Sequence, residues 1–332
     1  MLQTPRWQTH LGNFVLVRLR VLFFLIAFFC FSSSRCERDR TASRRSTDDP
    51  GKPWQEFSGE KALGHVQKLV ALGPRPPGSP AIEKARAYIT ETLTTYGWHV
   101  DRQAFTDDTP RGKVSFVNLI ADFPTRKSSA STQSKFLLCS HYDTKTFETI
   151  RFVGANDGGS STGALMEMAR VLSLHPELAA KIELVFFDGE ESYETFTDTD
   201  GLYGSRYFAK KLVDEKRTGA FRGGILWDMI GDRDLTITLP PDSPAELARG
   251  IFESATALNQ RSHFSYFANG ITDDHTPLNA AGVTTIDLID FDFEWWHTAG
   301  DTMDKISAES LQTVGAVTAY YLSEFAFKEQ SQ

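Results

Sequence analysis

The stretch Lys181-Ile-Glu-Leu-Val-Phe-Phe-Asp-Gly-Glu-Glu-Ser192 decides the predicted fold. Its apolar run ends at Phe187 and changes abruptly into a glycine and a group of acids. A short apolar run that ends in this way is typical of a buried strand that leads into a loop. Ligands of parallel α/β sheets bind outside the carboxyl ends of the strands, so Glu190 and Glu191 are predicted to face a site. Taken alone, two adjacent glutamates are more often solvated loop charges.

Predicted strands and helices alternate along the rest of the chain. Apolar runs predict further strands at 98–105, 114–123, 136–140, 223–228, 235–239 and 284–289. Helical spacing of apolar residues predicts helices at 62–72, 81–93, 160–174, 205–212, 244–258 and 308–327. This alternation, without an internal repeat, predicts a single α/β domain: a mostly parallel, twisted central sheet with helices on both faces.

Composition and charge narrow the class of protein. The chain has 332 residues, of which 41% are hydrophobic and 23% charged, as in ordinary globular proteins. Residues 54–329 are predicted to form one catalytic domain, because large α/β domains often exceed the usual domain size. The net charge of -8 and the pI near 5.5 give no electrostatic case for nucleic acid, and we expect none as a partner.

The first residues have the pattern of an export signal. Arg18 and Arg20 precede an eleven-residue apolar core, 21–31, and three serines follow that core. This order predicts a secretory signal peptide over residues 1–34 and a secreted, periplasmic or lumenal protein. Extension of the apolar run back to Val15 leaves an uncleaved membrane anchor as the alternative. Residues 35–53 are polar and charged, and they are predicted to form a disordered tether.

Ionisable residues recur in the loops that follow the predicted strands. Each has an ordinary explanation by itself: Asp157 as a helix cap, Asp228 as a structural carboxylate, His297 as an interior histidine. So many carboxylates at one edge would repel one another unless a cation joined them. Oxygen ligands with imidazole and without cysteine suit a catalytic zinc ion. The recurring residues are His141, Asp143, Asp157, Glu190, Glu191, Asp228, Asp273, Asp274, His275 and His297.

The motifs in this order resemble the zinc-dependent aminopeptidase clan, over nearly the whole chain after residue 54. The matching stretches are His141-Tyr-Asp-Thr, Asn156-Asp-Gly-Gly-Ser-Ser, Phe187-Asp-Gly-Glu-Glu, Leu226-Trp-Asp and Trp296-His-Thr. Within that clan, Leu202-Tyr-Gly-Ser-Arg and Asp273-Asp-His-Thr-Pro-Leu look most like the glutaminyl cyclases. The resemblance implies an aminopeptidase-like fold and an acyltransferase that acts on the N-termini of peptides or proteins.

The resemblance also implies a role for individual residues. One zinc ion would be held by Asp157, Glu191 and His297. Glu190 would be the general acid and base that closes N-terminal glutamine to pyroglutamate with release of ammonia. Asp228 and Asp273 would form an acidic hydrogen-bonded network with Glu190. The substrate pocket would be lined by Trp296, Phe293 and Phe196.

Three positions depart from the pattern of the glutaminyl cyclases. Cys139 is the one cysteine in the predicted catalytic domain, and Thr162 stands where secreted animal members have its disulfide partner, so no disulfide is expected. We expect Cys139 to be a small buried apolar residue without a catalytic role. Phe196 replaces a common tryptophan and Leu278 a common phenylalanine, which affects the expected shape of the pocket.

Two other functions stay open. A di-zinc aminopeptidase of the same clan would use His141 and Asp228 for a second zinc ion, with Asp157 as a bridge, and would need two ions per chain. The sequence retains all these ligands, and Asp273 and Trp296 favour the cyclase. A catalytically inactive binding ectodomain would have lost at least one of the proposed ligands or Glu190, and none is lost. The oligomeric state is not predicted.

Overall fold

The apolar run before the two glutamates forms β4 (Ile182–Phe187), a fully buried strand inside a six-stranded sheet. A computed structural model of the chain describes residues 51–124 and 134–327. The strand order is β1-β2-β4-β3-β5-β8. Strands β3 (Lys135–His141), β4, β5 (Phe221–Asp228) and β8 (Thr285–Ile289) run parallel, whereas β1 (His99–Thr109) and β2 (Gly112–Asp122) form an antiparallel hairpin at one edge. The predicted mostly parallel sheet is confirmed.

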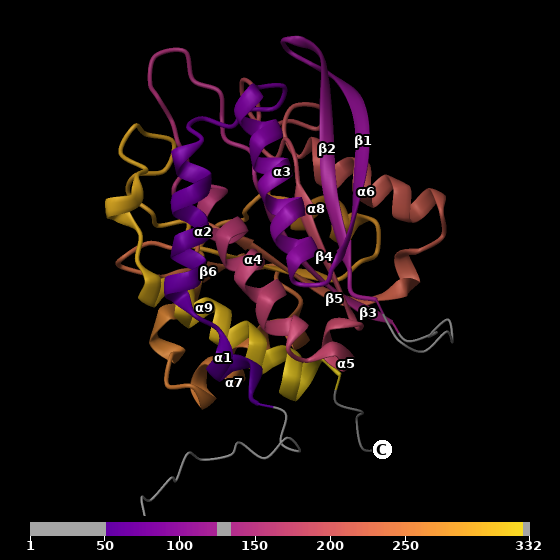
Figure 1. Cartoon of the computed structure of the whole chain (residues 1–332), viewed down its shortest axis with the longest axis vertical. Coiled ribbons are helices and arrows are strands. Elements are labelled where there is room, and N and C mark those ends of the chain that lie inside the picture. Colours follow the sequence, from indigo (N-terminus) through magenta and orange to yellow (C-terminus); the bar gives the residue numbers. More distant parts are fainter. Residues whose placement is uncertain (1–50, 125–133, 328–332) are drawn as a thin grey trace, which may run out of the picture. The chain divides into compact units, whose positions relative to one another are not determined.

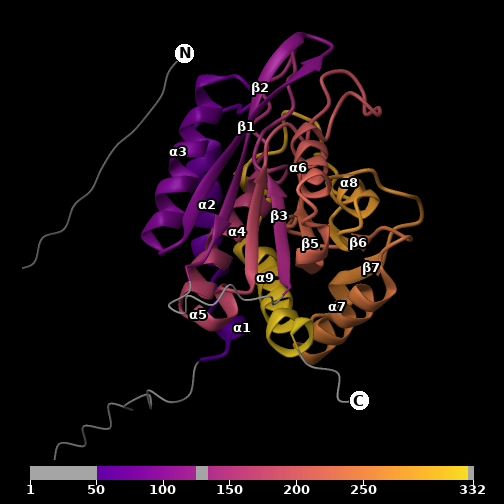
Figure 2. The same ribbon diagram turned by 90° about the vertical axis from the view of Figure 1, so that its right-hand side faces the viewer.

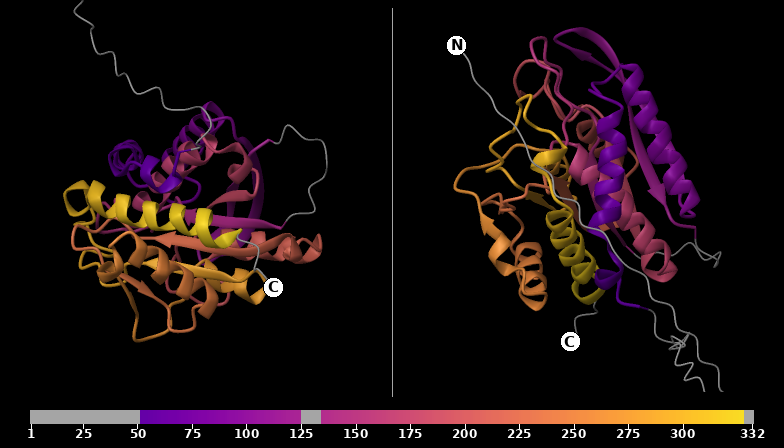
Figure 3. Two further views of the ribbon diagram at one scale, coloured as in Figure 1. Left: turned by 90° about the horizontal axis from the view of Figure 1, so that it is seen from below. Right: turned by 60° about the vertical axis from the view of Figure 1, so that its left-hand side comes forward.

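Helices cover both faces of the sheet because side chains alternate along each strand. Leu138 and Leu184 face the larger core, which includes residues of α2 (Gly59–Ala71), α3 (Pro80–Thr95), α4 (Gly159–Ser173), α7 (Ala245–Ala257) and α9 (Ala308–Tyr321). Leu137 and Val185 face a smaller core with α6 (Tyr203–Asp214) and α8 (His275–Ala280). Figure 2 shows α2 and α3 on one side of the sheet and α6 and α8 on the other. Helix α9 packs against both α2 and α7 (Figure 3).

Capping residues in the sequence fix where the first helices begin. Ser58 accepts a hydrogen bond from the backbone of Lys61 at the start of α2, and Ser79 accepts one from Ile82 at the start of α3. Pro80 occupies the first turn of α3, where a missing N–H costs nothing. Both helices include the ranges that the spacing of apolar residues predicted, apart from one residue at the end of α2, and the capping residues explain why they begin earlier.

The structure adds elements that were too short to produce a periodic pattern. Strand β6 (Ile237–Leu239) lies within the strand predicted at 235–239, and it pairs in a second sheet with β7 (Phe264–Tyr266), which was not predicted and has only its first residue buried. Sequence reasoning also missed the short helices at 53–56, 176–179 and 275–280, and the predicted last helix changes at Leu322 into a π-helix. The remaining short elements are α1 (Pro53–Glu56), α5 (Pro176–Ala179), the 3₁₀ turns Thr218–Ala220, Arg261–His263 and Met303–Lys305, and the π-helix Leu322–Ala326.

Several predictions concern residues outside the described ranges. The leader, residues 1–34, and nearly all of the 35–53 tether lie there, and so does most of the polar loop before β3. The described part of the catalytic domain predicted for residues 54–329 falls within one compact unit. Among the helices of residues 51–124 and 134–327, none is long and apolar enough to span a membrane.

Candidate active site

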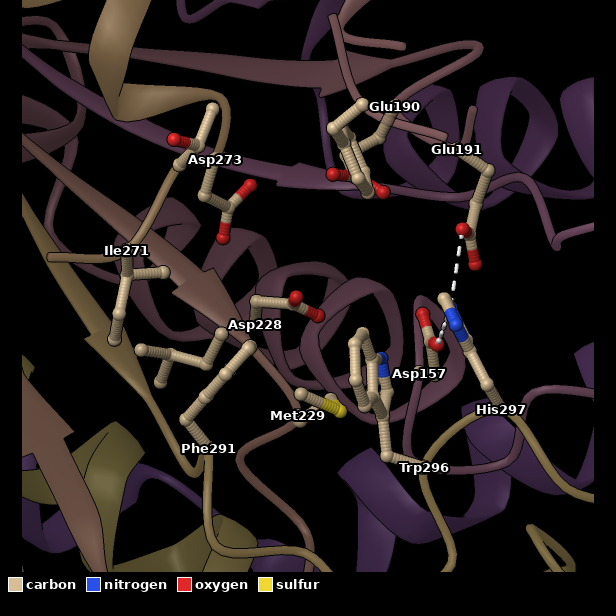
Figure 4. A pocket seen from close by; sticks show the side chains of 13 residues that line it. Asp157, Glu190, Glu191, Asp228, Met229, Ile271, Asp273, Phe291, Trp296 and His297 are labelled. Atoms are coloured by element: carbon tan, nitrogen blue, oxygen red, sulfur yellow. Dashed lines mark ion pairs between the residues drawn. The ribbon is translucent and has the colours of Figure 1, made fainter. Parts of the chain in front are cut away.

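Most of the predicted site residues meet at the carboxyl ends of the parallel strands, around a cavity of about 80 Å³ (Figure 4). Strands β3, β4 and β5 end at His141, Phe187 and Asp228, and β8 ends at Ile289. The strand ends and the loops after them supply most of the cavity wall, and the segment between β7 and α8 supplies residues 271–273. The wall is lined by Asp157, Glu190, Glu191, Phe196, Asp228, Met229, Ile271, Thr272, Asp273, Ile289, Phe291, Trp296 and His297.

The turn after β4 gives the two glutamates different directions. Gly189 has φ +71°, and a Cβ there would lie 2.5 Å from the ring of Phe116, so the position requires glycine. The buried carboxylate of Asp143 accepts hydrogen bonds from the backbone N–H groups of Glu190 (3.1 Å) and Glu191 (3.4 Å). Figure 4 shows Glu191 turned toward His297 and Glu190 turned into the cavity.

Asp157, Glu191 and His297 form a set of three converging donor atoms. His297 Nε2 lies 3.4 Å from Asp157 Oδ2 and 3.2 Å from Glu191 Oε2. Both carboxylate oxygens are buried and lack a well-aligned hydrogen bond among the described residues. Tetrahedral zinc with bonds near 2.0–2.1 Å would separate its ligand atoms by about 3.3 Å. Donor type, spacing and unsatisfied oxygens therefore fit a zinc ion.

A second set of donors shares Asp157 with the first. His141 Nε2 lies 3.3 Å from Asp157 Oδ1 and 3.2 Å from Asp228 Oδ1, and its Nδ1 faces Asp143 at 3.4 Å. Burial works against ionisation of Asp157, but the contacts with His141 and His297 outweigh it and lower the pKa of Asp157. The structure thus also assembles the donors that a second metal ion would need.

Asp157 does not have the ordinary role of a helix cap. Helix α4 has Gly158 at its N-cap and no side chain that caps it. Gly158 has φ +71°, and a Cβ there would lie 2.6 Å from the carbonyl oxygen of Asp143 and 2.8 Å from the ring of His141. Asp301 accepts hydrogen bonds from the backbone N–H groups of Asn156 (2.7 Å) and Asp157 (3.1 Å). These contacts fix the loop that carries Asp157.

A cluster of buried acids lies on the other side of the cavity. Burial, followed by the charges of Glu191 and Asp273, raises the pKa of Glu190 well above its ordinary value, although nearby His141 opposes the shift. Burial and the charges of Asp228 and Asp274 raise the pKa of Asp273 in the same way. Burial and mutual repulsion therefore favour the protonated forms of the acids in this cluster.

Sequence reasoning missed two buried acids of the site. Asp287 lies within β8, its Oδ2 is 3.4 Å from His275 Nδ1, and burial and Asp273 raise its pKa well above the ordinary value. An aspartate inside the apolar run of β8 was the available signal. Asp301 had no such signal, because an acid in a polar loop is ordinary.

Aromatic side chains surround the proposed ligand histidine. The Trp296 ring stacks on that of His297 at 4.2 Å between centroids, and Phe147 and Phe152 meet it edge-on. Trp296 is 41% exposed, so it forms part of the cavity mouth. Phe196 also lines the cavity, as expected.

The expectation for Phe293 was wrong. Its side chain is only 4% exposed and packs in an apolar cluster with Met229, Ile271 and Ile289. Phe291 lines the cavity instead. The chain turns away from the sheet after β8, and the spacing of two phenylalanines in this turn did not reveal which one faces inward.

The other departures have simple structural outcomes. Cys139 is a free, buried cysteine that packs in the smaller core, as expected. The hydroxyl of Thr162 donates a hydrogen bond to the carbonyl of His141 at 2.7 Å. Leu278 is fully buried in the same core as Cys139, so the substitution there changes packing behind the sheet rather than the cavity wall.

Comparisons with known proteins identify the family of this chain. Residues 118–322 match the model of peptidase family M28. A glutaminyl-peptide cyclotransferase of Dictyostelium discoideum is 28% identical over 310 residues, which cover 79% of this chain and 84% of that protein. A glutaminyl cyclase structure from an Acidobacteriales bacterium is 33% identical with a TM-score of 0.75, and the match covers 85% of this chain and 97% of that one.

A peptidase is also among the similar structures. A Zn-dependent exopeptidase from Parabacteroides distasonis is 26% identical with a TM-score of 0.72, over 81% of this chain and 99% of the other. The fold is therefore common to cyclases and exopeptidases, whereas the higher identity is to a cyclase. The chain belongs to peptidase family M28 and is related, within that family, to the glutaminyl cyclases.

Proposed function

We propose that the protein is a zinc-dependent glutaminyl-peptide cyclotransferase, which closes N-terminal glutamine to pyroglutamate and releases ammonia. The observation that carries the proposal is the wall of the cavity, where Asp273 joins Glu190 and Asp228 opposite the donors Asp157, Glu191 and His297. The similarity to a glutaminyl-peptide cyclotransferase and to a glutaminyl cyclase supports the same proposal.

The reaction needs one group that both accepts and returns a proton. The substrate α-amine attacks the carbon of its own γ-carboxamide, so nucleophile and electrophile belong to one residue and little positioning entropy is lost. Glu190 accepts the proton that the amine loses and gives it to the departing nitrogen, which leaves as ammonia. A carboxyl with a raised pKa is suited to both steps near neutral pH.

The remaining residues have supporting roles in this proposal. Asp157, Glu191 and His297 would hold one zinc ion, which when bound would polarise the γ-carbonyl. Besides burial, the charge of Asp273 raises the pKa of Glu190, and the charge of Asp228 raises the pKa of Asp273, so both acids would tune the proton transfer by Glu190. Trp296 and Phe196 form apolar walls at the mouth, where the side chain of the terminal glutamine enters.

A di-zinc aminopeptidase is the second candidate, and one observation favours it. The donors of His141, Asp157 and Asp228 lie within 4.8 Å of one another, close enough for a second ion. In that enzyme Glu190 would activate a water molecule instead of accepting a proton from the substrate amine.

Two measurements on the purified protein separate the candidates. Peptides that begin with glutamine should release ammonia without cleavage of the peptide bond, and leucine amides should stay intact. Metal analysis should give about one zinc ion per chain for the cyclase and about two for the peptidase. Hydrolysis of leucine amides would refute the proposed function.

We also propose that the protein acts outside the cytosol on peptide or protein N-termini. The basic, apolar and small residues of positions 1–34 support export. N-terminal sequencing of the protein recovered from the exported fraction would test the proposal: a start after residue 34 indicates cleavage of a leader, and an intact start in membranes indicates an anchor.

A further inference from the structure

A fully buried arginine, Arg75, contacts two loops of the site and comes from a part of the chain that precedes the family match. Arg75 follows α2 in the turn Arg75–Pro80, its side chain has no exposed surface, and the match to family M28 starts only at residue 118. A buried charge is costly unless other groups compensate it. Within residues 51–124 and 134–327, no carboxylate forms an ion pair with Arg75.

The guanidinium of Arg75 instead binds backbone carbonyl oxygens of two loops of the site. Nε donates to Tyr142 at 3.2 Å, just before Asp143. Nη1 donates to Val153 at 2.8 Å and Nη2 to Gly154 at 3.2 Å, in the loop that leads to Asp157. Weaker bonds at 3.5 and 3.4 Å reach the carbonyls of Leu69 and Gly73.

The same arginine is held in place through its backbone. Its N–H donates to the hydroxyl of Thr144 at 2.8 Å, and its carbonyl accepts from the N–H of Thr144 at 3.3 Å. Thr144 follows Asp143, the residue that binds the backbone of both glutamates. Burial lowers the pKa of Arg75 to about 10, so the group stays charged at neutral pH, and the nearby charges of Asp143, Asp301 and Asp157 support that charge.

We propose that Arg75 is a positioning residue for the zinc site: it holds the end of β3 and the 153–157 loop at the separation that the ligands Asp157, Glu191 and His297 require. The inference rests on the ligand set of the proposed function. A planar cation with donors on three nitrogens can join several carbonyls at fixed angles, which the single ammonium group of lysine cannot.

A second buried arginine offers a matched control. Arg86 in α3 also comes from the segment before the family match and is 2% exposed. It donates to the hydroxyl of Tyr142 at 2.8 Å and forms ion pairs with Asp188 and Glu83, but no bond joins it to the 153–157 loop. Arg86→Lys therefore tests the replacement of a buried guanidinium by an ammonium group without loss of the contact with the 153–157 loop.

The experiment compares Arg75→Lys with Arg86→Lys in the full chain. The zinc dissociation constant is measured by competition with a chelator, under conditions where circular dichroism shows each variant to be folded. We expect Arg75→Lys to raise that constant about 10- to 100-fold, as for other groups that orient metal ligands, and Arg86→Lys to change it less than about 3-fold. An unchanged constant in Arg75→Lys, or an equal rise in both variants, would overturn the inference.

A milder pair of variants covers the case in which Arg75→Lys does not fold. Thr144→Val removes the acceptor of the Arg75 backbone N–H, and Thr144→Ser keeps it. We expect Thr144→Val to raise the zinc dissociation constant by about 5-fold or more and Thr144→Ser to restore the wild-type value, whereas equal constants for the two contradict the inference. If the wild-type protein itself binds no zinc, the proposed ligand set has failed, and that result is distinct from failure of Arg75 alone.

Discussion

Replacement of Glu190 by glutamine separates proton transfer from metal binding. The change keeps the shape of the side chain but removes its ability to accept a proton. General acid–base catalysis contributes about 10²- to 10⁴-fold to a rate, which corresponds to about 3–5 kcal/mol of transition-state stabilisation. Because Glu190 is proposed to act in both the attack and the departure of ammonia, we expect kcat to fall by about 10⁴-fold, the upper end of that range.

Zinc content is the second readout of Glu190→Gln. The three converging donors come from Asp157, Glu191 and His297, so the variant should retain zinc. Stability should not decrease, since a neutral amide relieves the burial of an acid whose pKa the fold raises. The matched variant Glu191→Gln should lose zinc, because it replaces a proposed ligand. Loss of zinc from Glu190→Gln, or a kcat above about 1% of wild type, would refute the assigned roles.

Three further predictions concern the loop of Asp157, the metal and a histidine outside the site. Gly158→Ala should lower the free energy of unfolding by about 1–3 kcal/mol and should weaken zinc binding. Gly64→Ala, in the open interior of α2, should instead raise the free energy of unfolding by about 0.5–1 kcal/mol. Urea titrations of both variants check that the two changes have opposite signs. Removal of zinc by a chelator should lower the unfolding free energy by about 2.7 kcal/mol relative to protein with free zinc at 100 times the dissociation constant. A melting temperature that does not change with the zinc concentration would contradict the proposed zinc site. Burial and the charges of Lys68 and Arg170 lower the pKa of His65 to about 4, so its contribution to stability is complete above pH 6.5 and is lost toward pH 4, with about 2 kcal/mol missing at pH 5. His65→Gln should therefore reduce the loss of stability between pH 6.5 and pH 4. An unchanged loss in this variant would exclude His65 as its source.

The central sheet was predictable because each inner strand has a strong local signal. Runs such as 182–187 are apolar throughout, and each ends abruptly in polar residues. Strand β7 and helix α8 were not predictable, since three or six residues cannot establish a period against their surroundings. Their positions depend on tertiary packing alone.

The candidate site was predictable as far as each residue followed a strand. His141, Glu190 and Asp228 stand at strand ends, and parallel strands bring their carboxyl ends to one edge. Asp301 comes from a distant loop and accepts hydrogen bonds from backbone N–H groups of the Asp157 loop, for which the sequence has no pattern. Which of the two residues, Phe291 or Phe293, lines the cavity likewise depends on the direction of the turn after β8.

Because Trp296 stacks on His297, the intrinsic fluorescence of Trp296 should report on the state of the site. The indole ring lies 4.2 Å from the imidazole, and a charged imidazolium quenches indole emission by accepting an electron. A metal ion on His297 would displace the proton from that ring, so emission should brighten as the ion binds. The chain has six tryptophans, and a difference spectrum against Trp296→Phe isolates this one. Occupancy of the site can thus be followed by light, without a substrate or a label.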